Sequence, residues 1–450
     1  MDHRADSLIS LLSPGPAARP GGVTSRRMRG LAAMFADPDA QDVLYESSHY
    51  ARRIIDTPAR DATRRFCRVY VSEADEAEPT EPFAGHLQRL QLSATCEDLW
   101  RLAEHYGGAA LLLDVDDGRD PSEPIDTASV RSVRWVRAVD RHELQPVEWF
   151  DASAGRRAGE PMRYRLHLHG SSGGMILGPD GRSYAPRVHA DRVIRVIGCP
   201  IPRRMAPLYE GWGQSRLAVC AEEILRIHKA EGSIEKLLDE FGIAIAKIKG
   251  LVEMARSNNR ALLERRMEAL ALSKSTLRLI ALDSDGEDFS QRNSTVTGVA
   301  DIYSQVNIPA LASCAEMPIT LIFGTTPKGL NAGDDKAGRE NYHVSIHSRQ
   351  VGRLQPVVER VVELVRASRD GPGVAEDAEL RIEWASLDDL TDLEAAELRQ
   401  KQQQTDRGYW EMGVLSEREV RHSRFGGAGY STDTRLLEGE EPPAPDTAAS

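Results

Sequence analysis

The stretch LIFGTTPKGLNAGDDKAGRENYH, residues 321–343, raises the question of whether this protein binds a nucleotide. A phosphate-binding loop has the pattern G-x-x-x-x-G-K-[ST], in which the lysine reaches the phosphates and the hydroxyl holds Mg²⁺. Gly324 and Gly329 have this spacing. Leu330 and Asn331, however, stand where the lysine and the hydroxyl are required. The pattern therefore disfavours a nucleotide site and favours a polar loop made flexible by its glycines.

Aspartates at two places could bind a metal ion, because oxygen ligands suit Mg²⁺ and Ca²⁺. Asp114, Asp116 and Asp117 end a strand-like apolar run, but no glutamate follows at the calcium-loop offset. An Asp-Gly pair is also ordinary turn sequence. For Asp334 and Asp335, a metal site is disfavoured in the same way. We expect turns at the first place, and no metal site at either.

Histidines offer two further candidates. His167 and His169 form an H-x-H on a strand-like run, with no metal partner at a diagnostic distance, so an exposed strand face is favoured. His343 and Ser345 form the H-x-[ST] of two-histidine phosphodiesterases, which need a second such motif for acid and base catalysis. We find no convincing second motif and no G-x-S-x-G. The residues therefore predict neither an enzyme nor a cofactor.

The bulk composition bounds the class of protein. A length of 450 residues suggests two to four compact units, at about 150 residues each. The net charge of -12 argues against a protein that coats DNA through a basic surface, although DNA could still pass nearby. Five scattered cysteines without a C-x-x-C indicate a reduced, intracellular chain. Apolar runs are too short to span a bilayer, so we expect a soluble cytoplasmic protein.

The first 200 residues predict an α+β unit. A helix is expected over about 38–66, capped by Asp37 or Asp39 and broken at Pro58, and a second over 93–106. The run GGAALLLDVDDG reads as a buried strand that ends in a turn. Further strand-like segments follow, with turn signals between them: SVRWVRAVD, QPVEWF, RYRLHLHG and RVIRVIG. Their number predicts a large antiparallel component.

The middle of the chain predicts two long helices around a small insert. An amphipathic helix follows GWGQS and runs to about Phe241, and another is expected over about 294–307, with a kink or new turn at Pro309. Between them, GIAIAKIKGL and STLRLIAL read as strands around a helix at about 258–273. Two such helices can run side by side and display this β-α-β insert at their far end.

The C-terminal third predicts mostly helices. A strand-like apolar piece precedes Gly324, and a long helix over about 339–368 contains Pro356, which should kink it. ELRIEWA reads as a strand, and a later helix is capped by Ser416 with Glu419 as its capping-box partner. Residues 1–25 and 426–450 have the composition of a flexible arm and a disordered acidic tail.

The ordered set of these pieces resembles the portal proteins of tailed bacteriophages, in a branch known as a domain of unknown function. The resemblance covers about residues 40–370 and is carried by YESSHYARRIIDTPARDATR, HYGGAALLLDVDDG, GWGQS, IAKIKGL, MPITLIFGTTPKGLNAGDDKAGRENYH and RQVGRLQPVVERVVELV. Each piece is weak alone, and the C-terminal part matches less well. The much shorter head-completion adaptors are a less suitable comparison.

The resemblance implies an α+β portal fold divided into named regions. They are a flexible arm (1–25), a wing (26–205), a first stem helix (206–241), a clip (242–293), a second stem helix (294–318), a channel loop (319–340), a long kinked helix (341–369), a wing return with a short crown (370–425) and a disordered tail (426–450).

The resemblance also implies the function. Twelve copies would form a ring at one vertex of the virion capsid, assembled in the host cytoplasm with capsid and scaffold proteins. Double-stranded DNA would pass through without sequence specificity, and the terminase motor and head-tail adaptors would dock, without any membrane or cofactor. The channel loop would face DNA through Lys328, Asn331, Asp334, Asp335, Lys336 and Arg339. The clip would dock partners through Arg260, Glu264, Arg265 and Glu268. The alternative is a phage phosphodiesterase or nuclease acting on nucleotides.

Overall fold

The computed structural model describes residues 37–72, 80–167, 176–177, 183–184, 187–241, 244–248, 265, 279–283, 303–324, 332–375, 378–387, 392–425 and 434. The chain divides into two compact units. The first unit comprises Met1–Ala59, Trp100–Ala109 and Arg195–Tyr342, and the second comprises Arg60–Leu99, Ala110–Ile194 and His343–Ser450.

The first unit is mainly helical. Its elements are α3 (Pro38–Ser47), most of α4 (His49–Thr63), α7 (Arg216–Phe241), the strands β10 (Ala244–Ile248) and β11 (Leu279–Asp283), the π-helical turn η6 (Tyr303–Asn307), α11 (Ile308–Ala315), α12 (Ile319–Phe323) and the start of α13 (Ala332–Arg349). Strands β10 and β11 pair in parallel, as the predicted β-α-β insert requires.

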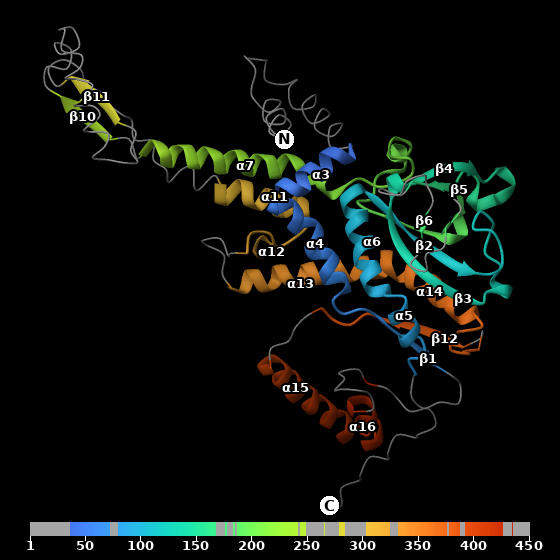
Figure 1. The fold of residues 1–450 in the computed structure, drawn as a ribbon. Coiled ribbons are helices and arrows are strands. Elements are labelled where there is room, and N and C mark those ends of the chain that lie inside the picture. The colour runs from blue at the N-terminus through green and yellow to red at the C-terminus, as the bar shows by residue number, and fades with distance from the viewer. Residues whose placement is uncertain are drawn as a thin grey trace, which may run out of the picture. The chain divides into compact units, whose positions relative to one another are not determined.

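Helix α7 is the long amphipathic helix that the sequence predicts. Its apolar stripe is buried and packs against α3, η6 and α11, and α7 runs beside α11 in Figure 1. The fully buried side chains of this stripe are Leu217, Cys220, Ile224 and Ile227. The predicted side-by-side pair of helices is confirmed from Tyr303 onward, and residues 294–302 lie outside the described part of the chain.

The predicted break at Pro58 is wrong. Asp37 caps α3 by accepting the backbone N–H of Asp39 at 3.2 Å, and the helix ends at Ser48, after which α4 continues through Pro58 to Thr63. A proline inside a helix costs about 3 kcal/mol. The buried side of α4, which includes Ile54 and Ile55, offsets that cost.

The second unit combines strands and helices. Its elements are β1 (Arg68–Ser72), α5 (Ala84–Arg89), most of α6 (Leu92–Tyr106), most of β2 (Gly108–Asp116), β3 (Ser132–Asp140), β4 (Leu144–Trp149), β5 (Pro161–Leu166), β6 (Ile176–Leu177), β7 (Ser183–Tyr184), β8 (Arg187–His189), the start of β9 (Val193–Ile197), the rest of α13, the π-helical turn η7 (Gln350–Leu354), α14 (Gln355–Ala367), β12 (Glu379–Glu383), α15 (Asp392–Glu411) and α16 (Glu417–Phe425).

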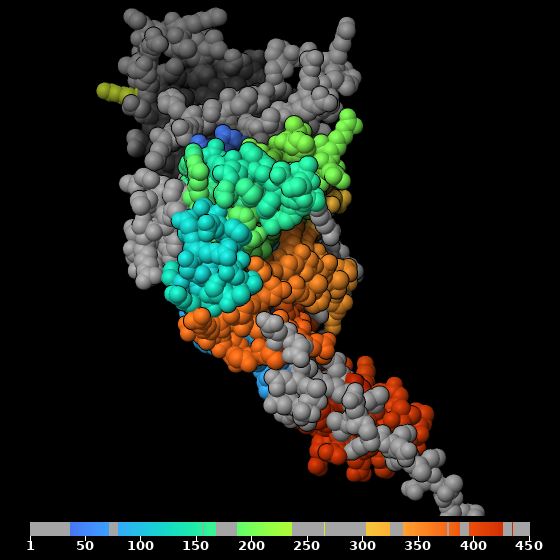
Figure 2. Space-filling model, turned by 90° about the vertical axis from the view of Figure 1, so that its right-hand side faces the viewer, coloured from blue at the N-terminus to red at the C-terminus, as the bar shows by residue number. Residues whose placement is uncertain are grey.

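Several small sheets hold the second unit together. The strand orders are β3-β2-β9 and β4-β5-β8, and β1 pairs with β12 in antiparallel register. Strand β2 is buried over its first eight residues, as its apolar sequence predicts. Helix α14 packs against β3, and their surfaces adjoin in the space-filling view (Figure 2, orange and cyan). The predicted α+β class is confirmed.

The C-terminal helices follow their sequence signals. A π-helical turn, η7, ends two residues before Pro356, the residue at which the sequence predicts a kink. Ser416 and Glu419 form the expected capping box, because Glu419 N–H donates to Ser416 Oγ at 3.2 Å and Ser416 N–H donates to Glu419 Oε2 at 2.8 Å. Arg424 of α16 binds both carboxylate oxygens of Asp406 of α15 at 2.7 Å, which joins the two helices. Within the described residues, no helix has the length and apolar character to cross a membrane.

A buried ion pair should dominate the stability of the second unit. Arg192 is 2% exposed, donates to both oxygens of Asp117 at 2.9 and 2.7 Å, and also donates to the carbonyl of Val115. Arg192→Ala leaves the Asp117 carboxylate buried and unpaired, so we expect a loss of about 3–5 kcal/mol in the free energy of unfolding. Urea titration followed by circular dichroism would measure it.

The matched control is Arg119→Ala. Arg119 pairs with Asp126 at 2.9 Å, but its side chain is 44% exposed, so the expected loss is below about 1 kcal/mol. Burial tends to raise the pKa of Asp117, but its bonds to Arg192 and to backbone N–H groups lower it overall. At a pH above the usual pKa of aspartate, the ion pair therefore stabilises the folded protein. This stabilisation is lost as the pH falls through the lowered pKa that Asp117 has in the folded protein. Equal losses in the two variants would contradict this assignment.

Candidate functional site: the start of helix α13 and its supports

The stretch predicted as a channel loop is helical at both ends. The strand-like piece before Gly324 is the helix α12, which ends where Gly324 takes a left-handed conformation at φ 73°. Helix α13 begins at Ala332, seven residues before its predicted start. The predicted loop over 319–340 is therefore wrong at both ends. Residues 325–331 lie outside the described residues, so the structure places neither Lys328 nor Asn331.

The early start of α13 has a physical explanation. The helix contains Gly333 and Gly338, although glycine costs about 1 kcal/mol in a helix interior. Asp334 and Asp335 fall in the first turn, where the helix dipole favours negative charge. Tyr342, farther along the same helix, is buried and anchors it.

Two of the predicted DNA-facing residues lie on the surface of this helix. Lys336 and Arg339 are exposed, and so is Glu340 beside them. His347 lies eleven residues after Lys336, on the same side of the helix, and is also exposed. The start of α13 therefore presents basic side chains to solvent on a regular scaffold, which suits a contact with an anionic partner.

Arg53 holds the end of α12, from which the undescribed residues 325–331 depart. Its Nη1 donates to the carbonyl of Ile322 at 3.0 Å. The guanidinium also lies 3.2 Å from the position that a Cβ would take at residue 324. A side chain at Gly324 would therefore meet both a strained backbone and this arginine.

A shared carboxylate joins α4, α7 and η6. Tyr50 and Tyr303 both donate to Glu231 Oε1, at 2.6 and 2.8 Å. Burial and the bond to Glu231 raise the pKa of Tyr303 to about 12, and the same causes raise the pKa of Tyr50 well above its usual value. Both phenols thus remain hydrogen-bond donors at neutral pH, and the carboxylate fixes the start of the returning helix to α7.

A buried arginine joins three further elements. Arg216, at the start of α7, donates through Nε to Glu104 of α6 at 2.9 Å and through Nη1 to Glu316 at 3.0 Å. Burial lowers the pKa of Arg216, but the charges of Glu104 and Glu316 raise it overall. Glu316 follows α11 in a left-handed conformation, at φ 55°. The arginine thus ties both long helices to α6.

The motifs HYGG and GWGQS meet next to this arginine. The amides of Gly198 and Gly213 both donate to the carbonyl of Gly107, at 3.1 and 2.9 Å. A Cβ at Gly107 would lie 2.5 Å from the carbonyl oxygen of Gly213, and its φ is 86°. Trp212 covers Gly108 so closely that a Cβ there would lie 2.4 Å from the indole ring. Only glycine fits this crossing of three chain segments.

The insert 242–293 is described only in part. Strands β10 and β11 pair from Ala244 with Leu279 to Ile248 with Asp283. Arg265 lies in a helical conformation and is exposed. Arg260, Glu264 and Glu268 lie outside the described residues. The predicted docking role of these four residues stays a prediction.

The candidate metal ligands near the end of β2 are each paired with an arginine. Arg134 contacts Asp114 at 3.9 Å and Asp116 at 2.8 Å, and Asp117 binds Arg192. The carboxylates therefore serve as ion-pair partners, and the turn at Asp117-Gly118 is present, with Gly118 at φ 75°. No group of three or more metal-binding side chains occurs among the described residues.

The described candidate histidines lie on an exposed strand surface and on helix α13. His167 contacts Gln145 at 2.9 Å on exposed strand surface, and His169 lies outside the described residues. His343 and Ser345 lie on helix α13, where residues two apart point to different sides. On a strand, the same spacing would place both side chains on one face.

Comparison with known proteins gives a family match over most of the chain. The phage portal protein family matches residues 41–407. The anti-CBASS protein Acb1 of Caulobacter sp. (strain RHG1) is 25% identical over 409 residues, which cover 87% of this chain and 61% of that protein. The protein of the same name from Sphingomonas paeninsulae is 24% identical, with 85% and 59% covered. The chain spans about three fifths of the length of these two relatives.

Further similarities extend to other proteins. An uncharacterized protein of Haemophilus influenzae is 24% identical, over 71% of this chain and 68% of that protein. The neck of a native GTA particle, computed with C12 symmetry, is 15% identical with a TM-score of 0.44, over 85% of this chain and 92% of that chain. The neck of an empty GTA particle, computed with C6 symmetry, is 16% identical with a TM-score of 0.45, over 90% and 95%.

The family match begins in α3 and ends in α15. It therefore includes the paired long helices, the parallel insert, the start of α13 and the glycine crossing. The chain belongs to the phage portal protein family.

Proposed function

We propose that the protein forms a ring, of twelve copies in its working form, at one vertex of a phage capsid. DNA enters through the ring during packaging and leaves through it during ejection. The packaging motor and the tail adaptors dock on the same ring, and the protein resides in the virion after assembly in the host cytoplasm. The observation that carries this proposal is the family match over residues 41–407.

We assign the proposed regions to the described elements. On this assignment helix α7 and the η6–α11 helix form the stem, and the β10–β11 pair belongs to the clip, residues 242–293. Val219 on α7 is 38% exposed and Val306 on η6 is 54% exposed. Apolar side chains on these helices suit coverage by a neighbouring copy, which supports a closed ring.

Contact with DNA rests on the start of α13. Lys336 and Arg339 are exposed and would touch phosphates, while Asp334 and Asp335 in the same turns would keep the contact weak. Phosphate contacts carry no base readout and weaken with salt. Together with the net charge of -12, this arrangement lets a duplex pass without tight binding.

An enzymatic role is the competing proposal, because two relatives carry the name anti-CBASS protein Acb1. About two fifths of each of these proteins lies outside the match, so their named activity can belong to sequence that this chain does not match. The H-x-S of His343 lies on a helix, which does not aim both side chains at one substrate. The structural role is therefore the better supported proposal.

The first prediction of this proposal is closed-ring assembly. Purified protein should form rings with a central hole, because the exposed apolar side chains on the stem require coverage. Negative-stain imaging and light scattering would measure this. A strictly monomeric species at all concentrations would contradict the proposal.

The second prediction concerns the charge of α13. Lys336→Glu combined with Arg339→Glu should leave rings intact and reduce DNA packaging in infected cells by at least tenfold, because both phosphate contacts become repulsive. Lys401→Glu with Arg407→Glu, two exposed positions of α15, is the control with the same change in charge. Equal packaging in the two double variants would contradict a DNA-facing α13.

The third prediction concerns the insert. Reversing Arg265 and Glu268 together should preserve the circular dichroism spectrum, because Arg265 is exposed, and should impair assembly or packaging. If packaging and ring formation match the wild type, this surface is only solvated. The same infected-cell assay applies, with the Lys401 and Arg407 variant as the charge control.

A further inference from the structure

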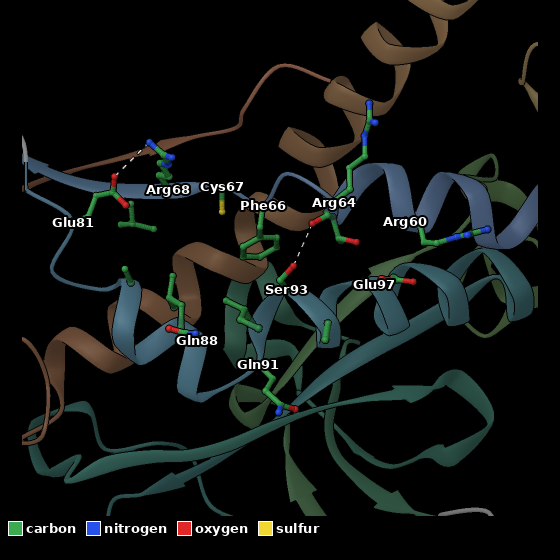
Figure 3. Close-up of a pocket in the computed structure, with 16 residues that line it drawn as sticks. Arg60, Arg64, Phe66, Cys67, Arg68, Glu81, Gln88, Gln91, Ser93 and Glu97 are labelled. Carbon is green, nitrogen blue, oxygen red and sulfur yellow. Dashed lines mark hydrogen bonds and ion pairs between the residues drawn. The ribbon is translucent and has the colours of Figure 1, made fainter. Parts of the chain in front are cut away.

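The second unit contains a hollow of about 760 Å³ that the proposed channel does not use. It lies between the start of β1 and the helices α5 and α6 (Figure 3). Phe66, Cys67 and Leu87 give it an apolar lining, and Ala84 and Ala94 are small, exposed residues in its wall. The volume is sufficient for several side chains of a bound peptide.

One edge of β1 is open beside this hollow. Val71 exchanges both backbone hydrogen bonds with Thr80, at 3.0 and 3.3 Å, on the side away from β12. By the two-residue period of a strand, the N–H and C=O of Val69 point to that same side. The next partner along this edge would be Pro82, which has no N–H to donate. Among the described residues, the bonds on this edge stop at Val71.

The rim of the hollow is more basic than acidic. Arg60, Arg64 and Arg68 line it, against Glu81 and Glu97. Arg68 and Glu81 lie at one end in Figure 3, and Arg60 and Glu97 lie at the other. Arg68 is 60% exposed and contacts Glu81 at 3.9 Å. A strand bound at the open edge would therefore fit best with an apolar side chain pointing inward and a carboxylate pointing toward Arg68.

We propose that residues 435–441 of a second copy, RLLEGEE, bind this hollow as an added strand on β1. In an extended segment Leu437 and Glu438 point to opposite faces, as Val69 and Arg68 do. Leu437 enters the hollow beside Val69, and Glu438 pairs with Arg68. Addition of a strand to an exposed sheet edge is an established mode of peptide recognition.

The charges of the two ends of the chain favour residues 435–441 over the N-terminal residues as the bound segment. Residues 1–36 carry five arginines and two aspartates, which the basic rim would repel. Residues 435–441 carry one arginine, then two leucines, and three glutamates after them, so the segment is acidic on balance.

We assign the segment to a second copy. Arg424 donates to Thr434 Oγ1 at 3.0 Å, so about 10 Å of extended chain leads from this bond to Leu437. Binding by the tail of the same chain is the outcome that the test below must exclude. In a ring each copy offers one hollow and one tail, so a head-to-tail contact closes. The inference rests on the proposed ring.

Hydrogen–deuterium exchange of the peptide that spans residues 66–72 tests the proposal in the assembled full chain. Deletion of residues 435–450, or Leu437→Asp, should speed exchange at Val69 at least tenfold. Deletion of residues 443–450 alone is the matched control and should leave exchange unchanged. Arg68→Glu should also speed exchange, and adding Glu438→Arg to it should restore protection, which a merely structural loss at Arg68 would not allow.

The outcomes separate this inference from the proposed ring. If rings form and Val69 exchanges equally in intact protein and in the 435–450 deletion, the ring stands and the docking is wrong. If the intact protein is monomeric and Val69 is still protected by the tail, the tail of the same chain fills the hollow. That result would overturn both the second-copy assignment and the ring.

Discussion

The buried guanidinium of Arg216 is the interaction on which the first unit depends. It binds Glu104 and Glu316 and so fixes the start of α7 to α6 and to the end of α11. The Glu104 side chain is 3% exposed, whereas that of Glu316 is 53% exposed, so Glu104 is the buried partner of this arginine. Removal of one partner from a buried pair costs about 3–5 kcal/mol, so loss of Glu104 should destabilise the contact between α7 and α6 most.

The crossing of the segments that contain Gly107, Gly198 and Gly213 also fixes the position of α7. Three segments approach so closely at Gly107 that any side chain would displace the backbone. The crossing sets where α7 begins, and the carboxylate of Glu231 farther along α7 sets where the returning helix begins, through Tyr50 and Tyr303. The pair of helices is therefore fixed to its neighbours at two separate points along α7.

Much of the fold could be predicted from the sequence because its signals are local. The periodicity of α7, the apolar run of β2 and the capping box at Ser416 each depend on neighbouring residues. Pro58 misled the prediction, because burial of one side of α4 overrode the local preference against helix.

The supports of the candidate site could not be predicted in this way. Arg53, Glu104 and Glu231 find partners more than 70 residues away, and a single sequence contains no signal that pairs them. The family resemblance pointed to the region around α13 as a candidate site. The contacts that hold this region in place could be seen only in the structure.

The distribution of charge decides what the start of α13 can do. A protein with a net charge of -12 repels a duplex on average, and screening limits each contact to roughly 8–10 Å at physiological salt. On the proposed function, Lys336 and Arg339 would attract a phosphate only when it passes close to the helix. Because this attraction would be local and the repulsion distributed, DNA would gain little free energy by stopping at any one position. The proposed function therefore requires passage of DNA and not its retention.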